Sequence, residues 1–107
     1  MKQFLIPTSK GTKTVMEENI IRIEASSNYC KIFFNNERPL VVAKVLHWFQ
    51  DNLPEDTFFR IHRTHIVNRM HVAAPVDQGM LRLSNGDMVQ VSRRRKNYTD
   101  NLLKQSA

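Results

Sequence analysis

The chain has 107 residues, of which 41% are hydrophobic and 24% charged, and its net charge is +6. This length suits one domain over residues 1–107, and the composition excludes disordered and fibrous proteins. With a single cysteine, Cys30, and neither a membrane-spanning run nor a secretory signal, we expect a cytoplasmic protein without disulfides.

Short apolar runs of strand length follow one another along the chain, at residues 4–6, 20–25, 29–34, 40–42, 58–61, 81–83 and 89–91. In the second run Ile21, Ile23 and Ala25 alternate with Arg22 and Glu24, which predicts a strand with one buried and one solvated face. The sequence Asn-Gly at 85–86 predicts an antiparallel hairpin that joins residues 81–84 to 88–92.

Two segments have helical spacing instead. Apolar residues recur at 42, 45, 46, 49 and 53 ahead of Pro54, which predicts a helix over 43–53 with Trp48 shielding its edge. A second helix is predicted to begin at Ser92, as its N-cap, and to run through Leu103. Basic residues fill its first turn against the helix dipole, which favours a role in binding phosphate.

The excess of positive charge lies in the second half of the chain. Residues 1–56 carry seven basic and seven acidic side chains, whereas residues 57–107 carry nine and three. Residues 57–76 and 89–99 contain no acid at all, so each forms a basic cluster. Such a field attracts polyanions, and the candidate explanations are nucleic acid, an anionic membrane surface or simply a solvated basic face.

The segment 60–71 holds three of the four histidines, which raises the questions of metal binding and catalysis. Carboxylates that would orient ligating imidazoles are absent nearby, and three arginines would repel a cation. No nuclease motif, Walker loop, GxSxG sequence or carboxylate pair is present. We therefore expect no enzyme, no metal and no cofactor. For His62 and His65, a purely structural role, one ring packed at a strand end and the other exposed, stays open.

Three blocks of sequence carry a family resemblance: IIRIEASSNYCKIFF at 20–34, FFRIHRTHIVNRMHV at 58–72 and MVQVSRRRKNY at 88–98. In this order they resemble the LytTR DNA-binding domain, which response regulators carry. The family pattern is matched by Glu24, Asn28, Tyr29, Phe58, Arg60, His62, Arg63, Thr64, Val67, Asn68, Ser92 and Arg93. The match covers nearly the whole chain, and three blocks at consistent separation are more specific than one short motif.

The resemblance implies a mostly β fold of elongated antiparallel β-sheets with one or two short helices, whose loops enter the DNA major groove. By position, the implied DNA contacts are Asn28, Tyr29, Lys31, His62, Arg63, Thr64, Arg93, Arg94, Arg95 and Lys96. The implied partners are double-stranded DNA and a second copy of the chain on tandem half-sites. A receiver domain or sensor kinase of a two-component system is implied if the chain belongs to a longer protein; otherwise it is a stand-alone regulator.

DNA chemistry suggests how these residues divide the work. Arginine presents a planar donor fork that fits guanine, so we expect Arg63 and Arg94 to read bases. We expect Arg93, Arg95 and Lys96 to hold phosphates and His62 to brace its loop or contact the DNA backbone. Asn68 is interpreted as structural, with its amide satisfying backbone groups of a turn.

The sequence thus predicts a sequence-specific transcriptional regulator that binds duplex DNA. The alternative is a small β-rich RNA-binding module, which would need aromatic side chains exposed on a sheet face. The expectation that Phe33, Phe34, Phe49, Phe58 and Phe59 lie in the core favours DNA, and Tyr29 is ambiguous.

Overall fold

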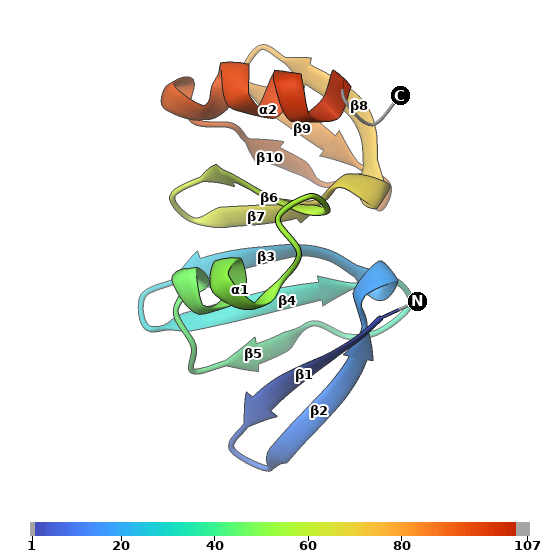
Figure 1. Cartoon of the computed structure of the whole chain (residues 1–107), viewed down its shortest axis with the longest axis vertical. Coiled ribbons are helices and arrows are strands. Elements are labelled where there is room, and N and C mark those ends of the chain that lie inside the picture. The colour runs from blue at the N-terminus through green and yellow to red at the C-terminus, as the bar shows by residue number, and fades with distance from the viewer. Residues whose placement is uncertain (1, 105–107) are drawn as a thin grey trace.

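The computed structural model describes residues 2–104, and Figure 1 shows how their helices and strands are arranged. The strands are β1 (Gln3–Thr8), β2 (Gly11–Met16), β3 (Ile20–Ser26), β4 (Tyr29–Phe34), β5 (Leu40–Val42), β6 (Phe58–His62), β7 (His65–Asn68), β8 (Val72–Asp77), β9 (Met80–Leu83) and β10 (Met88–Gln90). The α-helices are α1 (Leu46–Asn52) and α2 (Lys96–Lys104), and the short 3-10 helices are η1 (Glu17–Asn19), η2 (Arg69–His71) and η3 (Arg93–Arg95). The molecule is elongated, 40 × 30 × 24 Å, and the expected mostly β fold with two short helices is confirmed.

The described strands form three antiparallel sheets. A five-stranded sheet of order β5-β4-β3-β7-β6 occupies the middle of the molecule (Figure 1). The three-stranded sheet β10-β9-β8 lies at one end of the long axis and the β1–β2 hairpin at the other. The apolar runs do not predict β2, β7 or β8. Most side chains of β2 are exposed. Strand β8 contains Pro75 and lies at the edge of its sheet, where proline is tolerated although it cannot donate a hydrogen bond to a neighbouring strand.

The five-stranded sheet is buried on both faces by two separate hydrophobic clusters. Neighbouring residues on a strand contribute to opposite clusters, as the alternation of side chains requires. In each of the pairs 33/34, 58/59 and 66/67, one side chain lies in the first cluster and the other lies in the second. One cluster packs under α1 and the β1–β2 hairpin, and the other packs under the three-stranded sheet and α2. The expected core phenylalanines are buried except Phe33, which is half-buried beneath the Arg22 guanidinium, 3.7 Å from its ring centroid.

The predicted alternation along β3 is wrong at its start. The pairing of β3 with β4 shifts between Ile20 and Arg22, as in a β-bulge, so Ile20 and Ile23 share one cluster while Ile21 enters the other. Arg22 is not on a solvated face either, since it is only 9% exposed. It reaches the β9–β10 turn, where its Nε donates to Asp87 at 2.9 Å, and thereby ties the five-stranded sheet to the three-stranded sheet.

The predicted helix over 43–53 is shorter at both ends and begins at Leu46. Val45 precedes it in extended conformation, has no capping side chain and is 60% exposed, so its place in the apolar pattern was coincidental. Leu46 and Phe49 form the buried face, and Trp48 packs edge-on against Phe49 with ring centroids 5.0 Å apart. Neither of the described α-helices has the length and hydrophobicity that crossing a membrane requires.

The predicted hairpin is confirmed, because β9 pairs antiparallel with β10 around Gly86, whose φ of 90° suits glycine. The C-terminal helix differs from expectation at its start. Ser92 is followed by η3 before α2 begins, and its side chain makes no capping hydrogen bond. Its hydroxyl is instead buried without a hydrogen-bond partner within residues 2–104.

Candidate nucleic-acid interface

Three segments that are distant in sequence meet at one edge of the five-stranded sheet. The β3–β4 turn and the β6–β7 turn are neighbours, because the Ala25 N–H donates to the Thr64 carbonyl at 2.9 Å. The start of η3 lies beside the end of β6, where the Ser92 N–H donates to the Ile61 carbonyl at 2.9 Å. Figure 1 shows both turns and the beginning of the C-terminal helical segment on the left side of the molecule.

This edge carries most of the side chains implied by the family resemblance. Asn28 and Tyr29 lie at the β3–β4 turn, and Tyr29 is 54% exposed. Lys31 is also exposed but lies further along β4, opposite Glu24, with its ammonium group 5.2 Å from the centroid of the Phe33 ring. Of the first group of implied contacts, the turn residues are therefore at the edge and Lys31 is set back from it.

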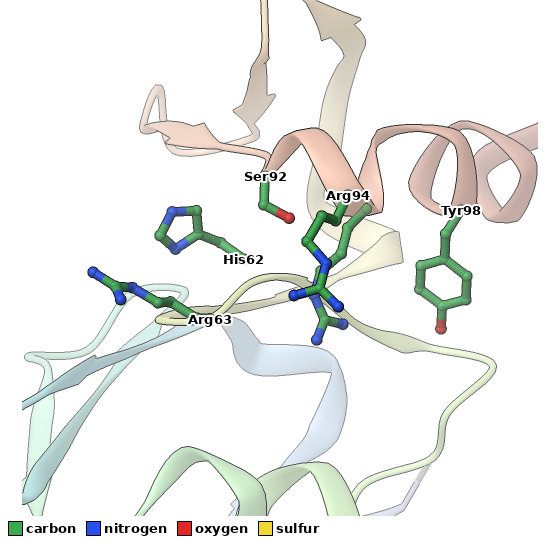
Figure 2. A pocket seen from close by; sticks show the side chains of 6 residues that line it. His62, Arg63, Ser92, Arg94 and Tyr98 are labelled. Carbon is green, nitrogen blue, oxygen red and sulfur yellow. The ribbon is translucent and has the colours of Figure 1, made fainter.

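The second and third groups surround a shallow hollow of about 460 Å³. It is lined by His62, Arg63, Ser92, Arg94, Arg95 and Tyr98. Figure 2 shows Ser92 and Arg94 descending from the η3 segment toward the hairpin that carries His62 and Arg63. The two basic clusters predicted at 57–76 and 89–99 thus both contribute residues to a single positive surface.

The arginines of this surface are not neutralised by acids. Within residues 2–104, no acidic side chain forms an ion pair with Arg60, Arg63, Arg93, Arg94 or Arg95. Arg63, Arg93 and Arg94 are exposed. Lys96 differs, because its Nζ lies 3.6 Å from the Asp100 carboxylate one helical turn away. Cations held together without counter-charges repel one another, so the surface is suited to an anion.

Arg60 lies behind this surface and contacts both of its basic segments. Its Nη2 donates to the Arg63 carbonyl at 2.7 Å, and its own carbonyl accepts from Arg95 Nη1 at 3.1 Å. Its Nη1 donates to Gln50 Oε1 of α1 at 2.9 Å. Burial, together with the positive charge of Arg95, lowers the pKa of Arg60. From the sequence, Arg60 belongs to a basic cluster and receives no role of its own. Its position between Phe59 and Ile61 was the available signal, because alternation along a strand puts Arg60 on the opposite face of the sheet from these two residues.

A polar chain supports the β6–β7 turn from its other side. Thr64 Oγ1 lies 2.8 Å from His62 Nδ1 and 2.9 Å from His65 Nδ1, and the two imidazole rings are 5.5 Å apart. His65 Nε2 lies 3.3 Å from Glu24 Oε1, which also accepts from Arg22 at 2.8 Å. Both histidines are half-buried, so the alternative that the sequence left open, one packed ring and one exposed ring, does not describe them.

The pKa values of Glu24 and His65 are both lowered in this polar network. The hydrogen bond from Arg22 lowers the pKa of Glu24 against the effect of its partial burial. Burial lowers the pKa of His65, although the nearby Glu24 carboxylate opposes the shift. A neutral His65 can donate a hydrogen bond from Nε2 to Glu24 and accept a hydrogen bond from the Thr64 hydroxyl at Nδ1. Thr64 therefore takes part in holding the turn.

Asn68, the last residue of β7, has the structural role expected for it. Its side chain is fully buried, and its Nδ2 donates to the Ile20 carbonyl at 2.8 Å. Its Oδ1 accepts from the Met70 N–H at 2.9 Å and caps η2.

Among the described residues, no cluster of three or more His, Cys, Asp or Glu side chains could hold a metal ion.

Comparisons with known proteins agree with this geometry. A solved structure of the LytTr DNA-binding domain of a response regulator from Bacillus cereus superposes with a TM-score of 0.79, at 28% sequence identity over 96% of this chain and 97% of that one. Comparison with the curated proteins found no match. The family model of the LytTr DNA-binding domain matches residues 10–104. The chain therefore belongs to the LytTr DNA-binding domain family.

Proposed function

We propose that this chain is a sequence-specific transcriptional regulator that binds double-stranded DNA, with the β6–β7 turn and the η3 segment inserted in the major groove. The observation that carries the proposal is a set of exposed arginines on two adjacent segments, the β6–β7 turn and η3, that form no ion pair with an acid within residues 2–104. Arginine is the side chain best suited to read guanine from such a position, and its charge supplies affinity for the phosphate backbone.

The disposition of aromatic rings favours duplex DNA over single-stranded RNA. Modules that bind single strands stack bases on aromatic rings exposed on a sheet. Here Phe34, Phe58 and Phe59 are buried, and Phe33 is covered by Arg22. Tyr29 and Tyr98 are exposed, but Tyr29 is the terminal residue of β4, next to the β3–β4 turn, and Tyr98 lies on helix α2. An RNA-binding module is therefore the weaker candidate.

We assign base reading to Arg63 and Arg94, both of which are exposed and border the hollow. Arg93 and Lys96 are assigned to phosphates, as is Arg95, which keeps further N–H groups while one of them bonds the Arg60 carbonyl. We also propose that Asn28 and Tyr29 contact the same duplex from the neighbouring β3–β4 hairpin.

Substitution of single cations tests this division. Arg63→Ala or Arg94→Ala should cost roughly 1 to 3 kcal/mol on the preferred site and relax the preference at particular base pairs. Lys96→Ala should weaken all sequences alike and flatten the salt dependence by about one unit. Lys104→Ala, at the far end of α2, is the control. Equal losses on preferred and random duplexes for all three variants would refute the assignment.

We further propose that two copies bind directly repeated half-sites on one face of the duplex. Where the chain is part of a longer protein, a receiver domain controlled by a sensor kinase would regulate that binding in the cytoplasm. The solved relative is a domain of a response regulator, which supports this placement in two-component signalling.

A further inference from the structure

We propose that Arg60 is a positioning residue that fixes the direction of Arg63 and thereby sets the base preference of the domain. The inference rests on the proposed function, because it concerns how the DNA-reading turn is held. Arg60 is not assigned a DNA contact. Its guanidinium instead bonds protein groups on both sides, which is the arrangement of a brace.

The contacts of Arg60 join three elements at one point. Its guanidinium bridges Gln50 on α1 and the main-chain carbonyl of Arg63 in the β6–β7 turn, at 2.9 and 2.7 Å. Its own carbonyl accepts from Arg95 of η3 at 3.1 Å. The planar guanidinium holds its N–H groups in a fixed geometry, so the two side-chain bonds set the turn relative to α1.

The Arg63 side chain needs such support. It is exposed and forms no ion pair within residues 2–104, so its direction depends on the backbone of a two-residue turn. The bond from Arg60 fixes the carbonyl of Arg63 and hence the peptide plane that joins Arg63 to Thr64. The Thr64 N–H belongs to the same peptide group and donates to His62 Nδ1 at 3.2 Å, while the Thr64 carbonyl accepts from the Ala25 N–H at 2.9 Å, so both peptide groups of the turn tip are constrained.

The surroundings of Arg60 are electrostatically unfavourable for its charged side chain, which a residue with a purely stabilising role would not require. Its Nε is buried without a hydrogen-bond partner among the described residues, and Arg95 lies close enough to lower its pKa. A half-buried cation is normally paired with a carboxylate. A carboxylate here would offset the positive surface that Arg63 and Arg95 present. An unpaired arginine can brace the turn and keep the surface attractive to DNA.

A double-mutant cycle separates bracing from direct contact. The preference for the selected site over random duplex is measured for the wild type, Arg60→Met, Arg63→Ala and the double variant. In the wild-type background, Arg60→Met should lower the preference by about tenfold. In the Arg63→Ala background, the same change should lower it by less than about twofold. The cycle is clean because Arg63→Ala keeps the carbonyl that Arg60 bonds.

Arg60→Lys tests whether charge alone suffices. A lysine keeps the charge but cannot hold Gln50 and the turn carbonyl in one rigid plane, so the preference should fall as in Arg60→Met while the salt dependence stays that of the wild type. Wild-type preference in Arg60→Lys would overturn the proposal. So would an equal loss from Arg60→Met on preferred and random duplex, which indicates a direct phosphate contact. Additive losses in the cycle would overturn it as well, because they indicate that Arg60 contributes to the preference independently of Arg63.

Gln50→Ala keeps the test available should the Arg60 variants not fold. This exposed change removes one anchor of the brace and should lower the preference in the same direction as Arg60→Met, by about threefold. Asn52→Ala on the same helix is the matched control and should leave the preference unchanged, because the Asn52 side chain donates to the Trp48 carbonyl within α1. No effect of Gln50→Ala would count against the brace. A wild type without preference for any duplex would instead refute the proposed function.

Discussion

Replacing Asn68 by alanine should destabilise the fold by about 3 kcal/mol, because the amide satisfies backbone groups of two connecting segments. The change leaves the buried Ile20 carbonyl and the Met70 N–H without their bonds of 2.8 and 2.9 Å, and removes a longer bond of 3.3 Å to the Glu17 carbonyl. A buried polar group without its partner costs about 1 to 3 kcal/mol, and partly exposed bonds contribute less. For a domain of this size the melting temperature should fall by roughly 10 to 15 °C.

Urea unfolding followed by circular dichroism measures this loss directly. Asn52→Ala is the matched control: it removes an exposed bond to the Trp48 carbonyl and should cost less than about 0.5 kcal/mol. A loss below about 1 kcal/mol in Asn68→Ala, or one no larger than that of the control, would show that the backbone groups find other partners.

Three further predictions follow from the buried groups and the DNA geometry. Because the pKa of His65 is lowered from 6.5 in the folded state, the unfolded chain takes up that proton first, so stability should fall as the pH drops from about 7 to about 5. His65→Gln should flatten this fall in urea titrations, and an unchanged slope would contradict it. Burial raises the pKa of Cys30 to about 11, so iodoacetamide at about pH 8 should label this thiol only in denaturant; rapid labelling of the folded protein would disprove this burial. Shifting two half-sites by about five base pairs should abolish cooperative binding in gel shifts but leave single-site binding intact, whereas equal cooperativity at every spacing would refute binding on one face.

Much of the fold follows from local sequence patterns. Apolar runs identify most strands of the five-stranded sheet, and Asn85-Gly86 identifies the β9–β10 hairpin because that dipeptide has the backbone freedom such a turn requires. The errors have local physical causes. The bulge near the start of β3 inverts the alternation after Ile21, and Val45 continues a helical spacing that the extended chain before α1 does not use.

The site was less predictable than the fold, because it depends on contacts between distant segments. The sequence placed Arg63 and Arg94 in separate clusters, and their meeting around one hollow depends on the hydrogen bond between Ser92 and Ile61. The burial of Arg22 is equally non-local, since its partner Asp87 lies 65 residues away. Charge arithmetic finds the basic segments, but it cannot distinguish a bracing arginine such as Arg60 from a reading one.

Selection of bound sites from random duplex DNA by the purified chain tests the central claim most directly. Enrichment of a defined sequence is expected, and for about five neutralised phosphates the logarithm of affinity should fall against the logarithm of salt concentration with a slope near −4 to −5. The enriched sequence should lose its advantage in a variant carrying both Arg63→Ala and Arg94→Ala. Recovery of unselected sequence, or affinity for duplex DNA that does not respond to salt, would contradict the account.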